Sequence, residues 1–440
     1  MRMSNSYLSM LAIATVLVVI VLLTPALKKK QPIANLPVPA EEESTRLQSA
    51  LETLGAADGA ASFDVICDCL TILTEEGKHH AEAGAVLIQI LPENSPLYRD
   101  RPRAQVHLIR GGVLATLARV GPPLQSMQWV LAELATTDDP FVFGAACQVA
   151  ASLGPRAAGS VSNIQRAFST NLMDHTFSLR DLRQRSPLQE PTTAKLEAVK
   201  ALQAIGPDAA GAMPILREIA EGTIAFVDKS DELREAAREA IQTLSNHDPS
   251  PKCCVREDSQ GYTTFTPWKV TSARPDPDIG GIQLRDQEGR EFCISDFSGN
   301  PVFLSFFYTR CDNLRKCSRT VSTAAALRDL TIQAGLSMRS HILLISLDPL
   351  FDDPLRLQEY ALARGFCPDR ESRVAQSTSG DLEILCRNLQ LPINFEGGRV
   401  NVHGIAAVLL DKEGRLARTY HSVSWDNDQV LTDLIRLTSE

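Results

Sequence analysis

The pattern of hydrophobic positions changes twice along the chain. Residues 8–27 carry no charge and are largely apolar, which at about 1.5 Å per residue is enough helix to cross a hydrocarbon core of about 30 Å. Residues 44–247 have apolar positions three and four apart, which predicts amphipathic helices. From residue 265 onward, apolar runs of strand length alternate with helical segments. The pattern therefore predicts a transmembrane helix, an all-α domain and an α/β domain.

Three Gly-Pro pairs divide the helical part. Gly121, Gly154 and Gly206 each end an Ala-rich segment and precede a second segment of helical periodicity. A left-handed glycine ends a helix and a proline fits the first turn of the next, so each pair predicts a helical hairpin. Small residues such as Ala146 and Ala198 would let paired helices approach closely. The stacked hairpins resemble HEAT-type repeats; an irregular helical bundle with coincidental Gly-Pro turns is the alternative.

Buried strands dominate the pattern of the last third. Residues 301–310 and 341–348 are continuous apolar runs, which is typical of central strands. Residues 404–411 and 416–422 predict a hairpin about a Lys-Glu-Gly turn, before a last helix at residues 427–438. The order of strands and helices predicts a sheet covered on both faces, in the thioredoxin-like arrangement. Further elements are expected at 279–297 (two short strands), 318–335 (a helix with Ser318 as N-cap) and 353–365 (a helix).

Three motifs follow one another in this C-terminal part. FFYTRC ends at Cys311, with Cys317 after it; ISLDPLFDDP contains Asp348 and Asp352; and VNVHGIAAVLLDKEGRL contains His403. In this order and spacing they resemble the Sco (SenC) family of membrane-tethered copper-delivery proteins. The resemblance implies that Cys311, Cys317 and His403 bind copper. It also implies that Asp348 and Asp352 hold these ligands in position without binding the metal themselves.

The residue types suit this chemistry. Copper(I) prefers soft thiolates and imidazole and accepts three ligands, and loops at the carboxyl ends of strands gather ligands in open α/β sheets. Residues 401–403 contain no proline where thioredoxin-type oxidoreductases carry a cis-proline, which favours metal binding over disulfide exchange. The sequence departs from the family in having five residues between Cys311 and Cys317 rather than three. In that loop, Arg315 and Lys316 are expected to lower thiol pKa values and to repel a cation.

The resemblance implies delivery of copper to the copper subunit of a respiratory oxidase, or reduction of that subunit's cysteines. Two other readings stay open. Cys311 and Cys317 could be the redox pair of a thiol–disulfide oxidoreductase without copper, or the helical repeats could be a scaffold for an unknown protein partner beside a degenerate thioredoxin-like domain. A plain disulfide and a strand-capping His403 are the structural alternatives. A metallochaperone is favoured over an enzyme.

Charge and the apolar run bear on location and partners. The net charge of −9, with no basic run longer than three residues, argues against nucleic acid as a partner. Lys28–Lys30 follow the apolar run and would place the bulk of the chain in the cytoplasm, whereas the family resemblance implies a single-pass anchor with extracytoplasmic domains. We follow the resemblance. The predicted domains are 1–30 (anchor), 31–43 (linker), 44–247 (helical repeats), 248–264 (linker) and 265–440 (Sco-like domain).

Overall fold

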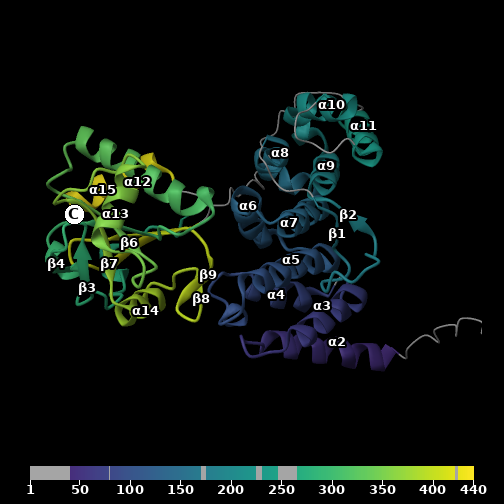
Figure 1. The fold of residues 1–440 in the computed structure, drawn as a ribbon, viewed down its shortest axis with the longest axis horizontal. Coiled ribbons are helices and arrows are strands. Elements are labelled where there is room, and N and C mark those ends of the chain that lie inside the picture. The colour runs from purple at the N-terminus through teal and green to yellow at the C-terminus, as the bar shows by residue number, and fades with distance from the viewer. Residues whose placement is uncertain (1–39, 79, 170–174, 224–229, 246–264, 422–424) are drawn as a thin grey trace, which may run out of the picture. The chain divides into compact units, whose positions relative to one another are not determined.

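The computed structural model describes residues 40–78, 80–169, 175–223, 230–245, 265–421 and 425–440. Helices make up most of the described residues before 245, and a mixed sheet with helices follows from residue 265 (Figure 1). We call residues 47–245 the helical half and residues 265–440 the sheet half. The prediction of an all-α region followed by an α/β region is therefore confirmed.

Alternate helices of the helical half pack side by side. Helix α5 lies against α7, α7 against α9, and α9 against α11 (Figure 1). Ala146 and Ala198 are fully buried between them, as expected of small residues that allow close approach. The helices are α2 (Ala40–Gly55), α3 (Phe63–Glu76), α4 (Ala81–Ile90), α5 (Arg103–Val120), α6 (Met127–Thr136), α7 (Pro140–Leu153), α8 (Val161–Ser169), α9 (Ala194–Ile205), α10 (Met213–Glu221) and α11 (Asp231–Ser245), with a short hairpin of β1 (Phe177–Ser178) and β2 (Pro191–Thr192) before α9.

The Gly-Pro pairs end helices as predicted but open different elements. Gly121, Gly154 and Gly206 have φ values of 105°, 58° and 75°, a region that favours glycine because a Cβ atom would clash there. After Gly154 and Gly206 the chain forms the 3₁₀ turns η3 (Gly154–Ser160) and η4 (Gly206–Ala212) rather than a second α-helix directly. Helical hairpins are present, but no observation confirms their assignment as HEAT-type repeats.

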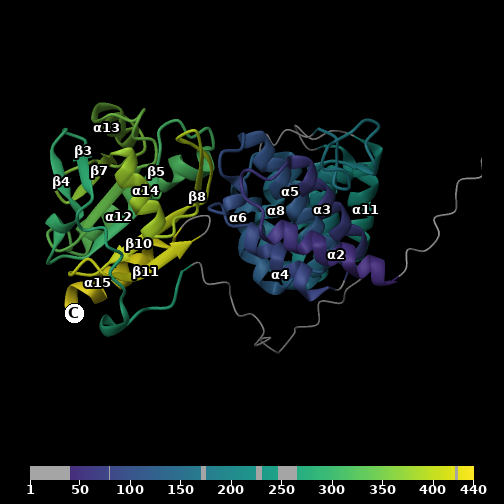
Figure 2. The same cartoon turned by 90° about the horizontal axis from the view of Figure 1, so that it is seen from below.

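One seven-stranded sheet organises the sheet half. Its strand order is β11-β10-β5-β6-β7-β3-β4, with β5, β6 and β7 parallel and the outer strands antiparallel. Figure 2 shows β10 and β11 at one side of this sheet and β3 and β4 at the other. The elements are β3 (Gln283–Asp286), β4 (Glu291–Cys293), β5 (Val302–Phe307), α12 (Arg319–Gln333), β6 (His341–Ser346), α13 (Pro354–Leu362), β7 (Ser372–Ser377), α14 (Ser379–Asn388), β8 (Ile393–Glu396), β9 (Arg399–His403), β10 (Ala406–Leu410), β11 (Leu416–His421) and α15 (Asn427–Ser439).

Strand β5 is the centre of the core because every one of its side chains is buried. It pairs with β6 in parallel and with β10 in antiparallel register, and α12 and α15 pack together against this region. The predicted central strands, the terminal hairpin and the last helix are present at the predicted residues. Four elements were missed, namely β7, α14, β8 and β9. Polar residues at both ends of β7 (SRVAQS) hide the strand from an apolar-run criterion.

The prediction of a single-pass membrane protein needs correction. The apolar run at residues 8–27 lies outside the described residues, as does the predicted linker at 248–264. Within the described ranges, no helix is both long enough and apolar enough to cross a membrane. The 18-residue α5, for example, carries Arg103, Arg110 and Arg119 along its length, and charges at such positions oppose insertion into hydrocarbon. The fold class is corrected to a helical half and an α/β sheet half. The prediction of a single-pass anchor with extracytoplasmic domains is withdrawn.

Candidate metal centre

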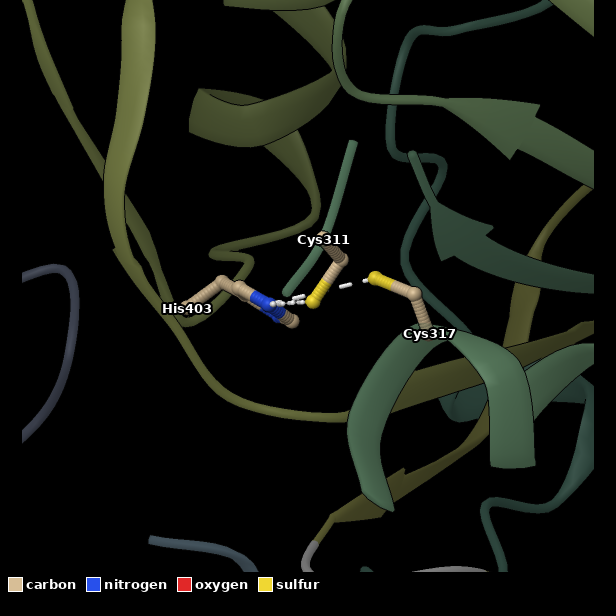
Figure 3. A group of neighbouring side chains, drawn as sticks. All are labelled: Cys311, Cys317 and His403. Carbon is tan, nitrogen blue, oxygen red and sulfur yellow. Dashed lines mark hydrogen bonds between the residues drawn. The ribbon is translucent and has the colours of Figure 1, made fainter. Parts of the chain in front are cut away.

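Cys311, Cys317 and His403 meet at one end of the sheet although His403 lies 86 positions after Cys317 in the chain. The His403 Nε2 atom lies 3.5 Å from the Cys311 Sγ and 3.9 Å from the Cys317 Sγ. All three potential ligand atoms lie within 4.8 Å of one another, and Figure 3 shows them pointing toward a common centre. Cys311 follows β5, and His403 is the last residue of β9.

The wide loop between the cysteines is shaped by a π turn. Residues Leu314–Ser318 form this turn, η7, and it carries Cys317 directly ahead of α12. Asn313 caps it, since its side-chain oxygen accepts a hydrogen bond from the Arg315 backbone N–H at 3.0 Å. The predicted N-cap, Ser318, makes no capping hydrogen bond; its hydroxyl accepts from Arg364 instead. Extra residues taken up as a π turn let Cys317 face Cys311 despite the longer spacing.

His403 is held in one tautomer. Its Nδ1 lies 3.0 Å from the Gly404 carbonyl oxygen, and because a carbonyl can only accept, Nδ1 must donate there. In the neutral ring this leaves the Nε2 lone pair facing the two sulfur atoms, whereas in the protonated ring Nε2 donates to the Cys311 sulfur. A backbone partner of this kind on the non-ligating nitrogen is typical of metal-binding histidines. The Tyr308 ring lies edge-on to the imidazole, with 5.4 Å between ring centroids, and restricts its rotation.

The two thiols have opposite electrostatic environments. The pKa of the Cys311 thiol is lowered to about 3, chiefly by a hydrogen bond from the Cys317 thiol and, against the opposing effect of burial, by the hydrogen bond and charge of His403. Burial raises the pKa of the Cys317 thiol well above its usual value, and the adjacent Cys311 sulfur raises it further. Cys311 is therefore the thiolate and Cys317 the thiol that donates to it. Lys316 lowers the pKa of Cys317 as expected, but burial outweighs this effect and the net shift is upward.

Alkylation of Cys311 should show this pKa directly. Only a thiolate reacts with iodoacetamide, so a thiol with a pKa near 3 is already ionised and its rate should stay nearly constant from pH 5 to pH 8. A reference peptide thiol with a pKa of about 8.5 should instead react about tenfold faster for each pH unit over this range. Mass spectrometry of the Cys311 peptide after timed quenching measures both rates. A rate for Cys311 that rises with pH like that of the reference would contradict the assignment.

Asp348 and Asp352 do not contact the three potential ligands but hold the segment that precedes Cys311. The Asp348 carboxylate pairs with Arg310, whose Nε lies 2.8 Å away. The Asp352 carboxylate accepts hydrogen bonds from the Thr309 N–H and hydroxyl and from the Ser346 hydroxyl. Burial raises the pKa of Asp352, although these hydrogen bonds oppose the rise. Asp352 thus fixes the backbone at position 309 and Asp348 holds the side chain at position 310, two residues and one residue before the first cysteine.

The donor set fits a soft, low-coordinate metal ion. With metal–ligand bonds of about 2.0–2.3 Å, as in zinc sites, a trigonal arrangement spaces its ligand atoms about 3.5–4 Å apart. The Nε2–Sγ distances of 3.5 and 3.9 Å meet that spacing. Two sulfurs and one imidazole suit copper(I), whereas structural zinc requires a fourth ligand. Within the described ranges, these three residues are the one cluster of His, Cys, Asp or Glu with such spacing.

Sequence reasoning missed the roles of two loop residues. Lys316 was expected to repel a cation, yet its Nζ donates to the His403 carbonyl oxygen at 2.6 Å and so ties the cysteine loop to the histidine strand. Asn313 was not singled out at all. Its position between the cysteines, where a polar side chain with no charge interrupts a charged loop, was the available signal.

Fold and donor set together define a class: a thioredoxin-like α/β domain with a Cys₂His site at the strand ends. The family model described as SCO1/SenC matches residues 272–439. The family resemblance is therefore confirmed for the sheet half. The match leaves the helical half outside it.

Solved structures similar to part of this chain include Sco proteins. A SCO1/SenC family lipoprotein from Bacillus anthracis str. Ames is 23% identical, covering 38% of this chain and 98% of that chain with a TM-score of 0.34. Yeast Sco1 with copper bound is 20% identical over 37% of this chain and 89% of that chain, with a TM-score of 0.30. BsSco, described as a member of the Sco family of cytochrome c oxidase assembly proteins, is 16% identical over 40% and 99%, with a TM-score of 0.34. Comparison with curated protein sequences gives no match.

Proposed function

We propose that this chain is a copper-binding protein of the Sco/SenC type, in which Cys311, Cys317 and His403 hold one copper(I) ion. The observation that carries the proposal is the convergence of two sulfurs and one imidazole nitrogen within 4.8 Å, inside the segment that matches the SCO1/SenC family. When bound, copper(I) would be held by soft donors that it prefers over oxygen ligands. The three residues come from two separate segments, so the fold and not the local sequence sets their spacing.

The client of this copper site is the finer part of the proposal. A copper-containing respiratory oxidase would receive the ion, or its own copper-ligand cysteines would be reduced by the Cys311–Cys317 pair. A site with three ligands and a half-buried Cys311 supports transfer, because an incoming thiolate from a client can add to a three-coordinate ion before a bound ligand leaves. The family match to the sheet half points to the same role.

Copper(I) titration of the full chain under anaerobic, reducing conditions tests the proposal. We expect one equivalent bound tightly enough to compete with a colorimetric copper(I) chelator. His403→Ala should weaken the affinity about tenfold to a hundredfold, because the two sulfurs alone leave the ion two-coordinate. The matched control is His175→Ala, at an exposed position in the helical half. Failure of the wild-type chain to compete, or equal affinities for both histidine variants, would overturn the proposal.

A thiol–disulfide exchange function is the second candidate. The split pKa values favour it, because a thiolate at Cys311 beside a protonated Cys317 is the arrangement of an attacking and a resolving thiol. In that reaction the two thiols would lose two protons and two electrons to form one disulfide, and oxidised glutathione would take the electrons to give two glutathione thiols. Reversible exchange with glutathione in a chain that binds no copper would select this candidate over the first.

A further inference from the structure

Both segments that carry potential metal ligands also contact the helical half. Residues Leu47–Glu440 form one compact unit, and within it the cysteine loop and the β8–β9 hairpin hydrogen bond to helical residues. Three asparagines of the sheet half make these bonds, and each is only 5% exposed. They are Asn313 in the cysteine loop, Asn394 in β8 and Asn401 in β9.

Asn313 links the loop to the helical half with its two amide ends. Its side-chain oxygen caps the π turn by accepting from the Arg315 N–H at 3.0 Å. Its Nδ2 donates to the carbonyl oxygen of Thr136, the last residue of α6, at 2.6 Å. Because the oxygen fixes the turn that presents Cys317 and the nitrogen fixes the whole amide, the position of α6 determines the conformation of the metal-binding loop.

The hairpin that ends in His403 is held in the same way. Asn394 donates to the Ser95 carbonyl oxygen at 2.6 Å, and Asn401 donates to the carbonyl oxygens of Tyr98 and Arg101 at 2.7 and 3.0 Å. The side chain of Val402, next to His403, packs into the core of the helical half. The strand that presents the imidazole therefore shares its packing with the segment between α4 and α5.

Two ion pairs border the contact at the cysteine loop. Asp312 pairs with Arg103 at the start of α5, and Arg315 pairs with Asp138 between α6 and α7. Asp312, Asn313 and Arg315 are three of the five residues between the cysteines. This loop, which is two residues longer than the spacing in the Sco family, thus contacts the helical half through most of its residues.

We propose that the helical half is a positioning clamp that sets the distance between the cysteine loop and His403, and that copper(I) binding and clamp docking therefore stabilise each other. The proposal rests on the proposed function for its ligand, copper(I), and adds the regulation of that site by the rest of the chain. By thermodynamic linkage, whatever loosens the clamp weakens copper binding by the same factor as copper tightens the clamp. A partner that captured α6 or the Ser95–Arg101 segment would thereby release copper, without touching the ligands.

A charge swap in the full chain tests the clamp. Asp138→Arg changes only the helical half, and we expect it to weaken copper(I) affinity about twofold to fivefold, the range for one exposed ion pair. Arg315→Glu should do the same, and the double variant should recover wild-type affinity because it restores the pair in reverse. Asn313→Asp keeps the capping oxygen but loses the donor to Thr136, so about tenfold weakening is expected. Asn388→Asp, which loses a similar amide donor to the Asp278 carbonyl within the sheet half, is the matched control.

Alkylation of the metal-free chain gives a readout that does not need copper. Cys317 is 1% exposed, so a loosened clamp should raise its alkylation rate several-fold in Asp138→Arg and Asn313→Asp but not in the double swap or in Asn388→Asp. If the wild-type chain binds no copper yet these rates change as described, the proposed function fails and the clamp stands. If Asp138→Arg alters neither copper affinity nor Cys317 alkylation, or the double variant is not restored, the clamp is overturned.

Discussion

Replacing either Cys311 or Cys317 with Ser is expected to abolish tight copper(I) binding, lowering the affinity of the full chain by at least about a hundredfold. The serine hydroxyl is nearly isosteric with the thiol but is a hard oxygen donor that does not ionise at neutral pH, and copper(I) selects soft thiolates. The two sulfurs also depend on each other, since the hydrogen bond from Cys317 keeps Cys311 ionised. Competition with a copper(I) chelator measures the loss.

The chain has ten cysteines, so a matched control is needed. Cys367 is an exposed free thiol in the sheet half, and Cys367→Ser removes one sulfur without touching the cluster. Its copper(I) affinity should equal that of the wild type. Near-normal binding by Cys311→Ser and Cys317→Ser would show that copper is held elsewhere in the chain and would contradict the assigned site.

Replacing Arg110 with Met should lower the free energy of unfolding by about 3–5 kcal/mol. Arg110 is 3% exposed and contacts two buried carboxylates, with its Nε 2.9 Å from Glu133 and its Nη2 3.4 Å from Glu93. It also donates to the Leu91 carbonyl oxygen at 2.5 Å. Met fills similar space but leaves both acids buried without the cation that contacts them, and removing one partner of a buried ionic network is strongly destabilising. Chemical denaturation of the full chain, followed by circular dichroism, gives the difference.

The pH dependence of this variant has a definite sign. Burial by itself raises the pKa of Glu133, but Arg110, together with Lys316 and His107, outweighs that effect and holds the pKa below its usual value. In the wild type, Glu133 therefore contributes stability above its unfolded pKa of about 4.3 that is lost as the pH falls. Without Arg110 the effect of burial remains, so the variant should become relatively more stable on acidification.

An exposed ion pair supplies the comparison for Arg110. Arg238 pairs with Glu235 at 2.6 Å on the surface of α11, where both side chains are more than half exposed. Arg238→Met should change stability by less than about 1 kcal/mol. Equal losses for the two substitutions would mean that the network around Arg110 has no special role in the helical half.

The sequence by itself determined the elements whose signals are local. The strands at β5, β6 and β10 follow from apolar runs, because a strand buried on both faces needs apolar side chains at successive positions. Strand β11, at the sheet edge, follows from the Lys-Glu-Gly turn that joins it to β10. The Gly-Pro breaks located helix ends, since positive φ at glycine is a property of one residue. Cys311, Cys317 and His403 were found in the same way, through motifs that each occupy a few consecutive residues. The membrane anchor was inferred from an equally local run, and the described helices do not bear it out.

Only the tertiary structure decided how these pieces act on one another. Strand β7 contains too many polar residues to be predicted from the hydrophobic pattern, and its place in the sheet is set by pairing with β6 and β3. The opposite pKa shifts of the two cysteines depend on burial and on the hydrogen bond between their sulfurs, and the spacing of the cysteines in the sequence predicts neither. The contact between Asn313 and Thr136 joins residues 177 positions apart. A donor and an acceptor this distant meet only when both halves have folded, because no local preference of either residue specifies the other.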